Sequence, residues 1–381
     1  MTIGNYTPKQ RMLNAYRGIA NDRPAVAPEL WYYYPAKLLG VDMIEFQRKT
    51  PFHLALKTTF EKFECEGWGL TFTEIPSSKA DTRVQETWVD RNTLDVQTKI
   101  KTPCGEIVSV ERYDKHEPSW VVERFIKDVE KDLPAYECAT LENNIEQMDT
   151  AALNKAWHEV GDSYLLEAWL GVPFFDYYGG GRQGGLEAAI FDFISNEALL
   201  ERLQAKYIDY MVRLAGHICK NTLLESLCIG CSWSCNSLIG PAMWRKWDKP
   251  VIQAVCEEIH RHNKLLHIHF HGKCMETVAD FAEIGIDCVC PFERPPGGDV
   301  VGLNGLKEAA RLLDGRVTMN GNVHTVETLI RGTPADVRRE VLEILEAFKG
   351  NNRFIVGTGD QVGRETPEEN LCAMIEQVKQ G

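Results

Sequence analysis

Short apolar runs alternate with long amphipathic helical patterns through the C-terminal two thirds of the chain. Regular alternation of this kind is typical of a parallel α/β fold. The runs that we interpret as strands are residues 163–170, 223–228, 265–271, 288–292, 317–320 and 354–357. The helical patterns are residues 186–221, 241–263, 273–284, 303–313 and 334–349, with a last helix from Thr366. No GxGxxG sequence directly follows a strand and no Walker loop occurs, which argues against dinucleotide-binding and P-loop folds.

Residues 83–126 show a different pattern. Four stretches of alternating polar and apolar residues are separated there by turn-forming residues, which predicts a small antiparallel β-meander. The stretches are 83–88, 93–101, 106–113 and 120–125. The chain shows no internal repeat and no linker-like segment. We therefore predict a single domain over residues 1–381, a (β/α)8 TIM-type barrel, with the meander at 83–126 as an insertion in its N-terminal third.

The charge balance limits the classes of partner. The chain has 42 basic and 55 acidic residues, a net charge of −13, and its basic residues form no patch. Nucleic acids and anionic membranes need clustered Lys and Arg, so we expect no nucleic-acid partner and no membrane partner. No apolar run approaches the roughly 18 residues of a membrane helix, and the start of the chain lacks a signal peptide. We expect a cytoplasmic protein whose 12 cysteines are core residues, metal ligands or reactive thiols.

Three histidines alternate along the predicted strand 265–271. His267, His269 and His271 share one face of that strand, because successive side chains point to opposite sides. In a barrel this face points inward, and His271 lies at the C-terminal rim, where barrel enzymes keep their active sites. Imidazoles at this spacing indicate a metal site, although hydrogen-bonded core histidines are the alternative. We expect His269 and His271 to be ligands and the deeper His267 to be structural.

Further polar residues follow the neighbouring strands at the same rim. They are Glu293 after strand 288–292, Asn322 and His324 after strand 317–320, and Asp360 after strand 354–357. We predict that Glu293 and Asp360 complete the metal site, and that His271, His324 and Asp360 are catalytic. A helix cap or a salt bridge is the alternative role of the two acids. Cys288 and Cys290, on the strand before Glu293, are interpreted as small core residues.

Two other segments are expected near the barrel mouth. The aromatic cluster Trp31–Tyr34 ends the first apolar segment, and it is either barrel core or the wall of an apolar pocket. In the second case Trp31 and Tyr33, with Asn322, bind the cofactor. The glycine-rich segment 176–185 is interpreted as a flexible loop that acts as a lid.

Five motifs in order resemble the uroporphyrinogen decarboxylase superfamily, and specifically its corrinoid-dependent methyltransferase branch. They are Arg23-Pro24 before the first strand, the helix start GPAMW at 240–244, HFHG at 269–272 in place of H-x-C-G, GNV at 321–323, and GTGD at 357–360 with TPEEN at 366–370. The resemblance implies a TIM barrel that covers most of the chain. It also implies a Zn²⁺ ion and a corrinoid (cobalamin), which a separate protein carries because this chain has no D-x-H-x-x-G corrinoid-binding motif.

The sequence departs from the branch at two zinc positions. Methyl-corrinoid:thiol methyltransferases of the branch bind zinc through H-x-C and a late Cys, whereas here His271 and Asp360 stand at the two Cys positions. Such a site is harder and more electrophilic than one with thiolates, which favours an oxygen leaving group. The resemblance and these departures predict transfer of a methyl group from a small methylated compound, a methoxylated aromatic one, to the cobalt of a corrinoid protein.

Alternative functions remain open at this point. The reverse half-reaction, from a methyl-corrinoid to tetrahydrofolate or a thiol, has the same residue requirements. A non-catalytic barrel that binds a tetrapyrrole needs no metal. A uroporphyrinogen decarboxylase resembles its relatives at an arginine-rich N-terminal stretch, but residues 29–34 of this chain contain no arginine, which argues against that activity. The partners expected are a corrinoid protein and a small methyl donor or acceptor, and a homodimer is a further assembly to test.

Overall fold

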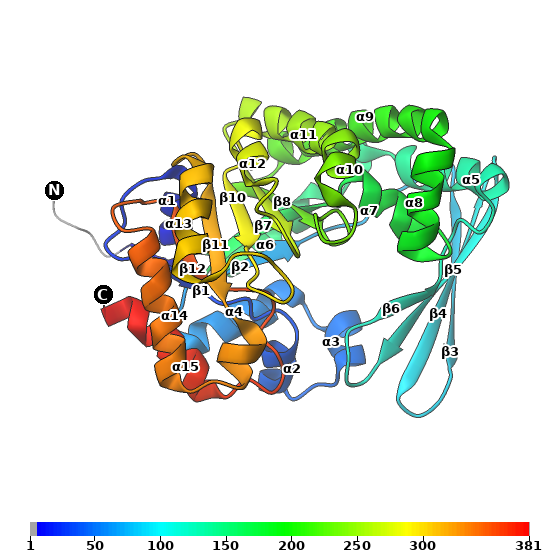
Figure 1. Cartoon of the computed structure of the whole chain (residues 1–381). Coiled ribbons are helices and arrows are strands. Elements are labelled where there is room, and N and C mark those ends of the chain that lie inside the picture. Colours follow the sequence, from blue (N-terminus) through cyan, green and yellow to red (C-terminus); the bar gives the residue numbers. More distant parts are fainter. Residues whose placement is uncertain (1–5, 381) are drawn as a thin grey trace.

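Eight parallel strands curl into a barrel at the centre of the computed structural model, which describes residues 6–380 (Figure 1). They are β1 (Ala25–Ala27), β2 (Trp68–Thr71), β7 (Leu165–Gly171), β8 (Ser226–Cys231), β9 (Leu265–Phe270), β10 (Cys288–Pro291), β11 (Thr318–Val323) and β12 (Phe354–Thr358). Hydrogen-bonded pairs connect the strands in the order β1-β12-β11-β10-β9-β8-β7-β2. The predicted TIM-type barrel is confirmed. The hydrogen-bonded strand pairs follow one another around it from β1 to β2.

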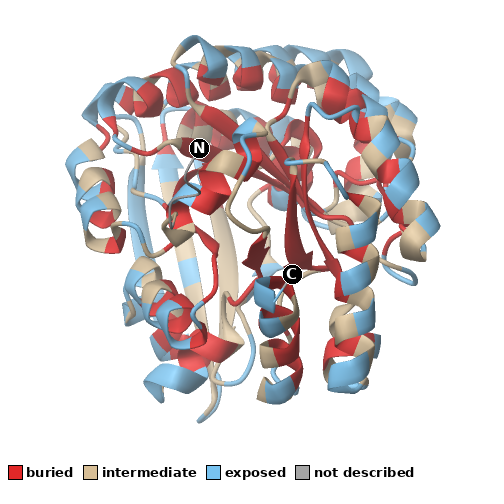
Figure 2. Cartoon of the chain, turned by 90° about the vertical axis from the view of Figure 1, so that its left-hand side faces the viewer, coloured by how far each residue is buried: buried red, intermediate tan, exposed pale blue. Residues whose placement is uncertain are grey.

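Helices surround the barrel and bury their inner faces on it (Figure 2). Those that follow the later strands are α9 (Glu197–Asn221), α10 (Gly240–Trp247), α11 (Lys249–Arg261), α12 (Val278–Ile284), α13 (Gly302–Leu313), the π-helical segment η2 (Thr325–Ile330), α14 (Pro334–Ala347) and α15 (Glu368–Gln380). Helix α14 begins at a capping box in which Thr333 and Asp336 satisfy each other's backbone N–H groups. Its first residue, Pro334, suits that position because the N–H that proline lacks has no partner there.

The N-terminal half contains shorter helices that the sequence patterns indicate less clearly. They are α1 (Pro8–Arg17), α2 (Tyr33–Leu39), α3 (Met43–Lys49), α4 (Phe52–Phe63), α5 (Val129–Leu141), the single turn η1 (Ile145–Gln147), α6 (Thr150–Val160), α7 (Phe174–Gly181) and α8 (Gly185–Ser195). Two helices predicted as continuous are broken. The first divides into α8 and α9 at Asn196, and the second into α10 and α11 at Asp248, just before Pro250. Proline has no N–H for the preceding turn, so it begins a new helix there.

A separate antiparallel sheet stands beside the barrel (Figure 1). Its strands are β3 (Asp81–Trp88), β4 (Thr93–Thr102), β5 (Gly105–Asp114) and β6 (Trp120–Glu123), paired in chain order. The predicted meander is confirmed. Strand β3 is exposed along its whole length, whereas Ile107 of β5 is buried in the same core cluster as Leu133 of α5. That the whole chain is one domain with this sheet as an insertion stays a prediction.

The glycine-rich segment 176–185 is not the flexible loop that we expected. Most of it belongs to helix α7, whose residues Phe174 to Gly179 are buried. The glycines serve close packing: a Cβ on Gly181 would lie 2.6 Å from Cζ of Tyr136. Asp176 fixes the helix further, because its carboxylate accepts hydrogen bonds from the backbone N–H groups of Ser232 and Trp233, each at 2.8 Å. The composition therefore signals tight contact between elements and gives no support for a lid.

None of the helices in the described part of the chain is long and apolar enough to cross a membrane.

Candidate functional site

The strand β9 directs its histidines into the barrel and its apolar side chains outward. Phe270 packs against the rings of Trp244 in α10 and Phe281 in α12, with ring centroids 6.0 and 5.1 Å apart. His267 and His269 point the other way and are buried. The register with β10 pairs His267 with Cys288 and His269 with Cys290. His271 follows the end of β9, at the carboxyl ends of the strands, and this end of the barrel is here called the mouth.

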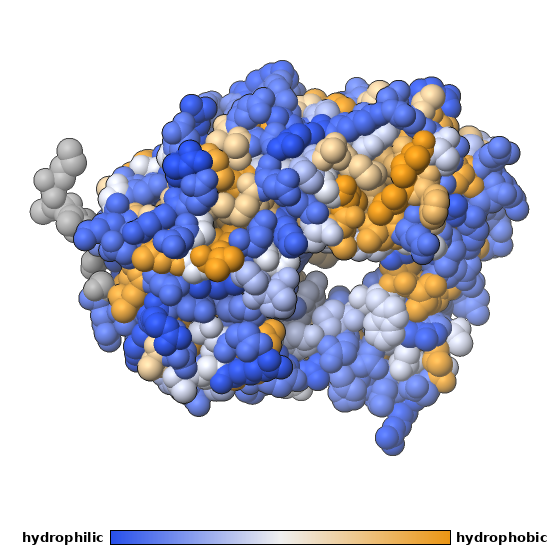
Figure 3. All heavy atoms as spheres, viewed as in Figure 1, coloured by the Kyte–Doolittle hydropathy of each residue, from blue (hydrophilic) through white to orange (hydrophobic). Residues whose placement is uncertain are grey.

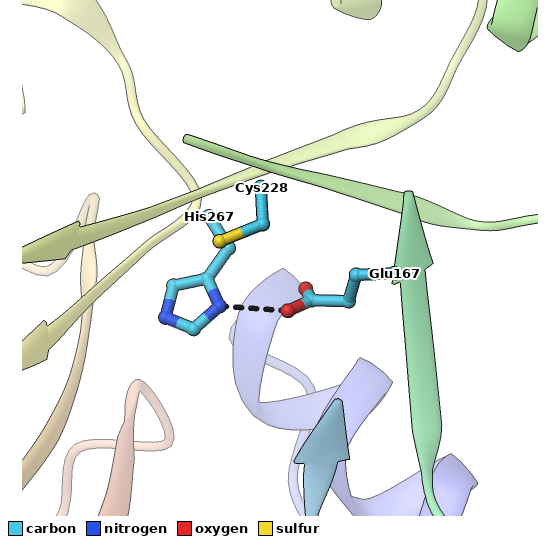
Figure 4. A group of neighbouring side chains, drawn as sticks. All are labelled: Glu167, Cys228 and His267. Atoms are coloured by element: carbon cyan, nitrogen blue, oxygen red, sulfur yellow. Dashed lines mark hydrogen bonds and ion pairs between the residues drawn. The ribbon is translucent and has the colours of Figure 1, made fainter. Parts of the chain in front are cut away.

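The histidines belong to two groups at different depths. His269, His271 and Asp360 form the mouth group, and their ligand atoms lie within 4.8 Å of one another. The floor group lies deeper in the barrel and consists of Glu167, Cys228 and His267 (Figure 4). Its ligand atoms also lie within 4.8 Å of one another. The three floor residues are completely buried, whereas His271 and Asp360 are half-buried. The structure thus brings three of the four predicted metal ligands together.

The fourth predicted ligand, Glu293, lies behind His271. Its Oε1 accepts hydrogen bonds from Nδ1 of His271 at 3.1 Å and from the backbone N–H of Gly272 at 2.8 Å. Gly272 has a φ of 72°, and a Cβ there would lie 2.7 Å from the hydroxyl of Ser237. The glycine thus lets the chain turn close enough for its N–H to reach Glu293. With Nδ1 held in this way, Nε2 is the nitrogen that His271 has free for the mouth group.

Three carboxylates surround the histidines of the mouth group. Burial raises the pKa of Glu29 well above its usual range, and the charge of Asp360 raises it further. Burial also raises the pKa of Asp360. Burial opposes protonation of His271, but the hydrogen bond to Glu293 and the charges of Asp360 and Glu29 outweigh it and raise the pKa of His271 to about 9. Negative charge on Glu29 and Asp360 is therefore disfavoured in the protein alone, and a cation beside them would favour it.

His269 is held differently from His271. Burial lowers its pKa well below the usual value, and the neighbouring His271 and His267 lower it further, so the ring is neutral. Its Nδ1 lies 2.9 Å from Sγ of Cys290. The indole of Trp31 stacks on the ring at a centroid distance of 5.9 Å and an interplanar angle of 25°. A neutral, clamped imidazole is in the form that binds a metal ion.

A cavity of about 680 Å³ lies over the mouth group. Aromatic side chains form much of its wall, and within residues 6–380 its lining includes neither arginine nor lysine. The aromatic, histidine and carboxylate side chains of the lining include Glu29, Trp31, Phe52, Trp169, His269, His271 and Asp360. Trp169 lies against Gly230, where a Cβ would approach its ring to 2.6 Å. Figure 3 shows this face of the molecule hollowed next to α3, whose Phe46 and Gln47 also line the cavity.

The floor group is a set of paired polar atoms. Oε2 of Glu167 lies 2.8 Å from Nδ1 of His267, as Figure 4 shows, and Oε1 accepts a hydrogen bond from the hydroxyl of Ser226 at 2.6 Å. The hydroxyl of Tyr16 also lies 3.1 Å from Nδ1 of His267. Nε2 of the same ring lies 3.1 Å from Sγ of Cys290. Both ring nitrogens of His267 are therefore engaged, which agrees with the structural role expected for it.

Three predicted site residues lie outside the cavity lining of the described chain. The hydroxyl of Tyr33 donates to Glu117 at 2.8 Å, because helix α2 begins at Tyr33 and turns it away from Trp31. The amide of Asn322 is buried and donates to the carbonyl of Phe292 at 2.9 Å. His324 caps η2: its Nδ1 accepts from two backbone N–H groups, and its Nε2 lies 3.0 Å from the carbonyl of Pro295. These contacts engage the polar atoms of Tyr33 and His324 away from the mouth group, whereas Oδ1 of Asn322 is buried without a hydrogen-bond partner among the described residues.

Sequence reasoning missed two residues of this region. Glu29 follows β1, so the rim argument used for Glu293 and Asp360 applied to it as well. Cys290 was interpreted as a core residue, and it is buried, but its sulfur joins the two histidine rings. The register of β10 against β9, which places Cys290 opposite His269, is the fact that the sequence did not reveal.

Comparisons with known proteins give a family match in sequence and a match in fold. A family model described as uroporphyrinogen decarboxylase (URO-D) matches residues 169–381. Uroporphyrinogen decarboxylases from two strains of Thermus thermophilus are each 28% identical over 186 residues, which make up 48% of this chain and 49% of theirs. The chain thus spans about half the length of the curated relatives it matches. A solved methyltransferase from Methanosarcina mazei shares the fold over 99% of both chains, with a TM-score of 0.67 and 16% identity.

Proposed function

The chain belongs to the uroporphyrinogen decarboxylase family, and from this premise we propose that it is a corrinoid-dependent methyltransferase that demethylates a small methoxylated aromatic compound. The family resemblance inferred from the sequence motifs is confirmed, and the fold match over the whole chain is to a methyltransferase. The chemistry of the cavity supports methyl transfer over decarboxylation of a porphyrinogen.

The charge of the cavity carries this choice. A uroporphyrinogen bears several carboxylates, and a protein that binds it needs cations or many N–H donors against them. The cavity of this chain presents Glu29 and Asp360, and its lining within residues 6–380 includes no arginine and no lysine. Such a wall offers a polyanion little beyond the imidazolium of His271, which Glu293 and Asp360 already pair with. A neutral aromatic compound needs no cation, and the rings of Trp31, Phe52 and Trp169 offer flat apolar surfaces for it.

The mouth group would hold a divalent metal ion, for which we expect Zn²⁺. Two imidazoles and a carboxylate with ligand atoms within 4.8 Å of one another are a donor set that zinc accepts. The buried carboxylates around them fit a cation as well. Glu293 then has the role of orienting His271 through Nδ1, and it is not a ligand itself. A bound zinc ion supplies a Lewis acid that stabilises negative charge on a departing oxygen.

Methyl transfer needs a leaving oxygen and a strong nucleophile. A Co(I) corrinoid, acting as co-substrate, would supply the electron pair for the new bond to the methyl carbon, and the bond between that carbon and the substrate oxygen would break. The electron pair of the broken bond would stay on the oxygen, which would take a proton from water, so that the demethylated compound leaves as a phenol. Trp31 and Trp169 hold the substrate ring, and His269, stacked on Trp31, stays in one orientation while the substrate is bound. The corrinoid reaches the cavity from the mouth on a partner protein.

A spectroscopic assay tests the proposal. Purified protein is incubated with cob(I)alamin and a panel of methoxyarenes, methylamines and methylated thiols, and the absorbance of methylated corrinoid is followed. We expect it to appear with methoxyarenes and to be abolished when the protein is first treated with a chelator. If methylcobalamin is consumed only after tetrahydrofolate or a thiol is added, the enzyme transfers the methyl group in the opposite direction, from the corrinoid to the acceptor. Release of carbon dioxide from uroporphyrinogen would replace the proposal with decarboxylation.

A further inference from the structure

We propose that Glu167, His267 and Cys290 form a hydrogen-bonded chain that decides which nitrogen of His269 carries hydrogen. The chain places the hydrogen on Nδ1 and leaves the lone pair of Nε2 for the mouth group. These three are positioning residues, since none of them lines the cavity. The use of that lone pair for a metal ion rests on the proposed function, whereas the position of the hydrogen does not.

The hydrogen-bonded chain begins at the carboxylate of Glu167. A carboxylate accepts hydrogen bonds and donates none. Oε1 accepts from the hydroxyl of Ser226 at 2.6 Å, and Oε2 lies 2.8 Å from Nδ1 of His267. Nδ1 must therefore carry hydrogen, because a bare nitrogen at that distance would put two acceptors face to face. In a neutral imidazole the other nitrogen, Nε2, is then an acceptor.

The next step passes through the sulfur of Cys290. Sγ lies 3.1 Å from Nε2 of His267 and 2.9 Å from Nδ1 of His269. A thiol has one hydrogen, so it can donate to only one of the two rings. His267 requires a donor at Nε2, so the S–H points to His267. The sulfur then accepts, and the donor that reaches it is Nδ1–H of His269.

The result is a defined state of His269. With hydrogen on Nδ1, a neutral ring has its lone pair on Nε2. Nδ1 is the ring nitrogen that bonds to Cys290, and the indole of Trp31 stacks on the ring and limits its rotation. A hydrogen bond to the nitrogen that does not face the metal fixes the tautomer of metal-binding histidines in general. Here the contact comes from a thiol, which is itself oriented by a buried carboxylate–imidazole pair.

Cys228 provides a matched control. It is a buried cysteine of the adjacent strand β8, level with His267 in the register, and it belongs to the floor group. Its thiol has no hydrogen bond to either histidine among those of the described residues. A Cys228→Ala variant thus removes a buried sulfur near His267 and keeps the chain from Glu167 to His269.

The first measurement reads the tautomer in metal-free protein. Histidine is labelled with ¹⁵N, and long-range ¹H–¹⁵N correlations are recorded for wild type and for Cys290→Ala, Cys290→Ser and Cys228→Ala, with His269→Gln to assign the signal. We expect His269 to carry hydrogen on Nδ1 in wild type and in Cys228→Ala. Serine offers the same single donor and an acceptor, so Cys290→Ser keeps this form, and Cys290→Ala loses the preference. Hydrogen on Nε2 in wild type would overturn the proposal.

The second measurement is zinc affinity by competition with a chromophoric chelator. We expect Cys290→Ala to bind zinc about 10- to 100-fold more weakly, the range usual for loss of a second-shell partner. Cys290→Ser and Cys228→Ala should stay within about 3-fold of wild type. If wild type and Cys290→Ala bind zinc equally and His269 keeps the same tautomer in both, the hydrogen-bonded chain is overturned and the proposed function is unaffected. If wild type binds no zinc but carries hydrogen on Nδ1 of His269, the hydrogen-bonded chain stands and the metal site of the proposed function is wrong.

Cobalt substitution separates positioning from ligation. If Cys290 were itself a ligand, the Co²⁺-loaded protein would show a sulfur-to-cobalt charge-transfer band that disappears in Cys290→Ala. We expect no such band in wild type, because the sulfur is engaged by both imidazoles. Its presence would turn Cys290 into a ligand and overturn the positioning role.

Discussion

One strand, β9, supplies histidines to two groups of metal-ligand-type residues, and the groups differ in how their atoms are used. In the floor group both oxygens of Glu167 and both nitrogens of His267 have hydrogen-bond partners. In the mouth group the nitrogen Nδ1 of each histidine is engaged, by Cys290 for His269 and by Glu293 for His271. The second nitrogen of each mouth histidine thus stays available.

This difference favours a structural role for the floor group and supports the proposed metal site at the mouth group. Proximity of three ligand-type residues occurs in both groups, so it does not by itself indicate a metal. A histidine with two partners has no lone pair left for an ion, whereas one with a single partner on its far side presents the other nitrogen. The surroundings also differ, since Glu29 and Glu293 lie near Asp360 of the mouth group, whereas Glu167 is the one carboxylate of the floor group.

Removal of His271 should break the mouth group most strongly. His271→Ala deletes a ligand, and we expect zinc affinity to fall by more than about 100-fold, beyond what loss of a second-shell partner causes. Equilibrium dialysis with elemental analysis measures it, and wild type should hold one zinc per chain. Cys228 belongs to the floor group, which is not expected to bind zinc, so Cys228→Ala should keep the zinc content of wild type. Zinc that survives in His271→Ala and disappears in Cys228→Ala would show that the floor group is the metal site.

Deletion of a carboxylate should destabilise the protein more in the floor group than in the mouth group. Glu167→Ala leaves Nδ1 of His267 without its partner in a fully buried place, and we expect a loss of about 3 kcal/mol in the free energy of unfolding. Asp360→Ala removes a carboxylate that burial disfavours and the charge of His271 favours, so the stability of metal-free protein should change much less. Urea unfolding in the presence of a chelator compares them. Similar losses in both variants would mean that the mouth group is also a paired structural cluster.

The barrel and its inward histidines were within reach of the sequence because both depend on local periodicity. Alternation with a period of two assigns His267, His269 and His271 to one face, and the C-terminal end of a parallel strand sets the depth order. The same rule placed Glu293 and Asp360 at the rim. These inferences need only the positions of residues along their own strands.

The hydrogen-bonding partners depend on contacts between distant segments and were not predictable in this way. Cys290 meets both histidines because β10 pairs with β9 in a particular register. Tyr33 was grouped with Trp31 as part of one aromatic cluster, but the start of α2 between them sends the two rings to different places. Likewise, the carboxylate of Asp248, where α10 ends, accepts the backbone N–H of Phe175 at a separation of 73 residues.

Proton competition should distinguish the mouth group in a further way. The pKa of His271 is about 9, raised above the ordinary 6.5, so the ring is protonated at neutral pH and zinc must displace that proton. Zinc affinity should therefore weaken by about tenfold for each pH unit below about 9. In metal-free protein the same proton stabilises the fold, fully below about 6.5 and no longer above about 9. Chelator competition at pH 7, 8 and 9 gives the slope, and a flat profile would contradict this role of His271.

The smallest expected effect concerns Tyr16, the second neighbour of His267 Nδ1. Its hydroxyl lies 3.1 Å from that nitrogen, compared with 2.8 Å for Oε2 of Glu167. The carboxylate is charged and closer, so it takes the hydrogen, and the phenol contributes a weaker contact. Tyr16→Phe keeps the ring and its edge-on packing against His267, with centroids 5.6 Å apart. We expect a loss of about 1 kcal/mol in the free energy of unfolding, and zinc affinity within about 3-fold of wild type. Urea unfolding and chelator competition on the same preparation measure both. A tenfold loss of zinc affinity would show instead that the phenol governs the state of His267, and Glu167 would then not be the start of the chain.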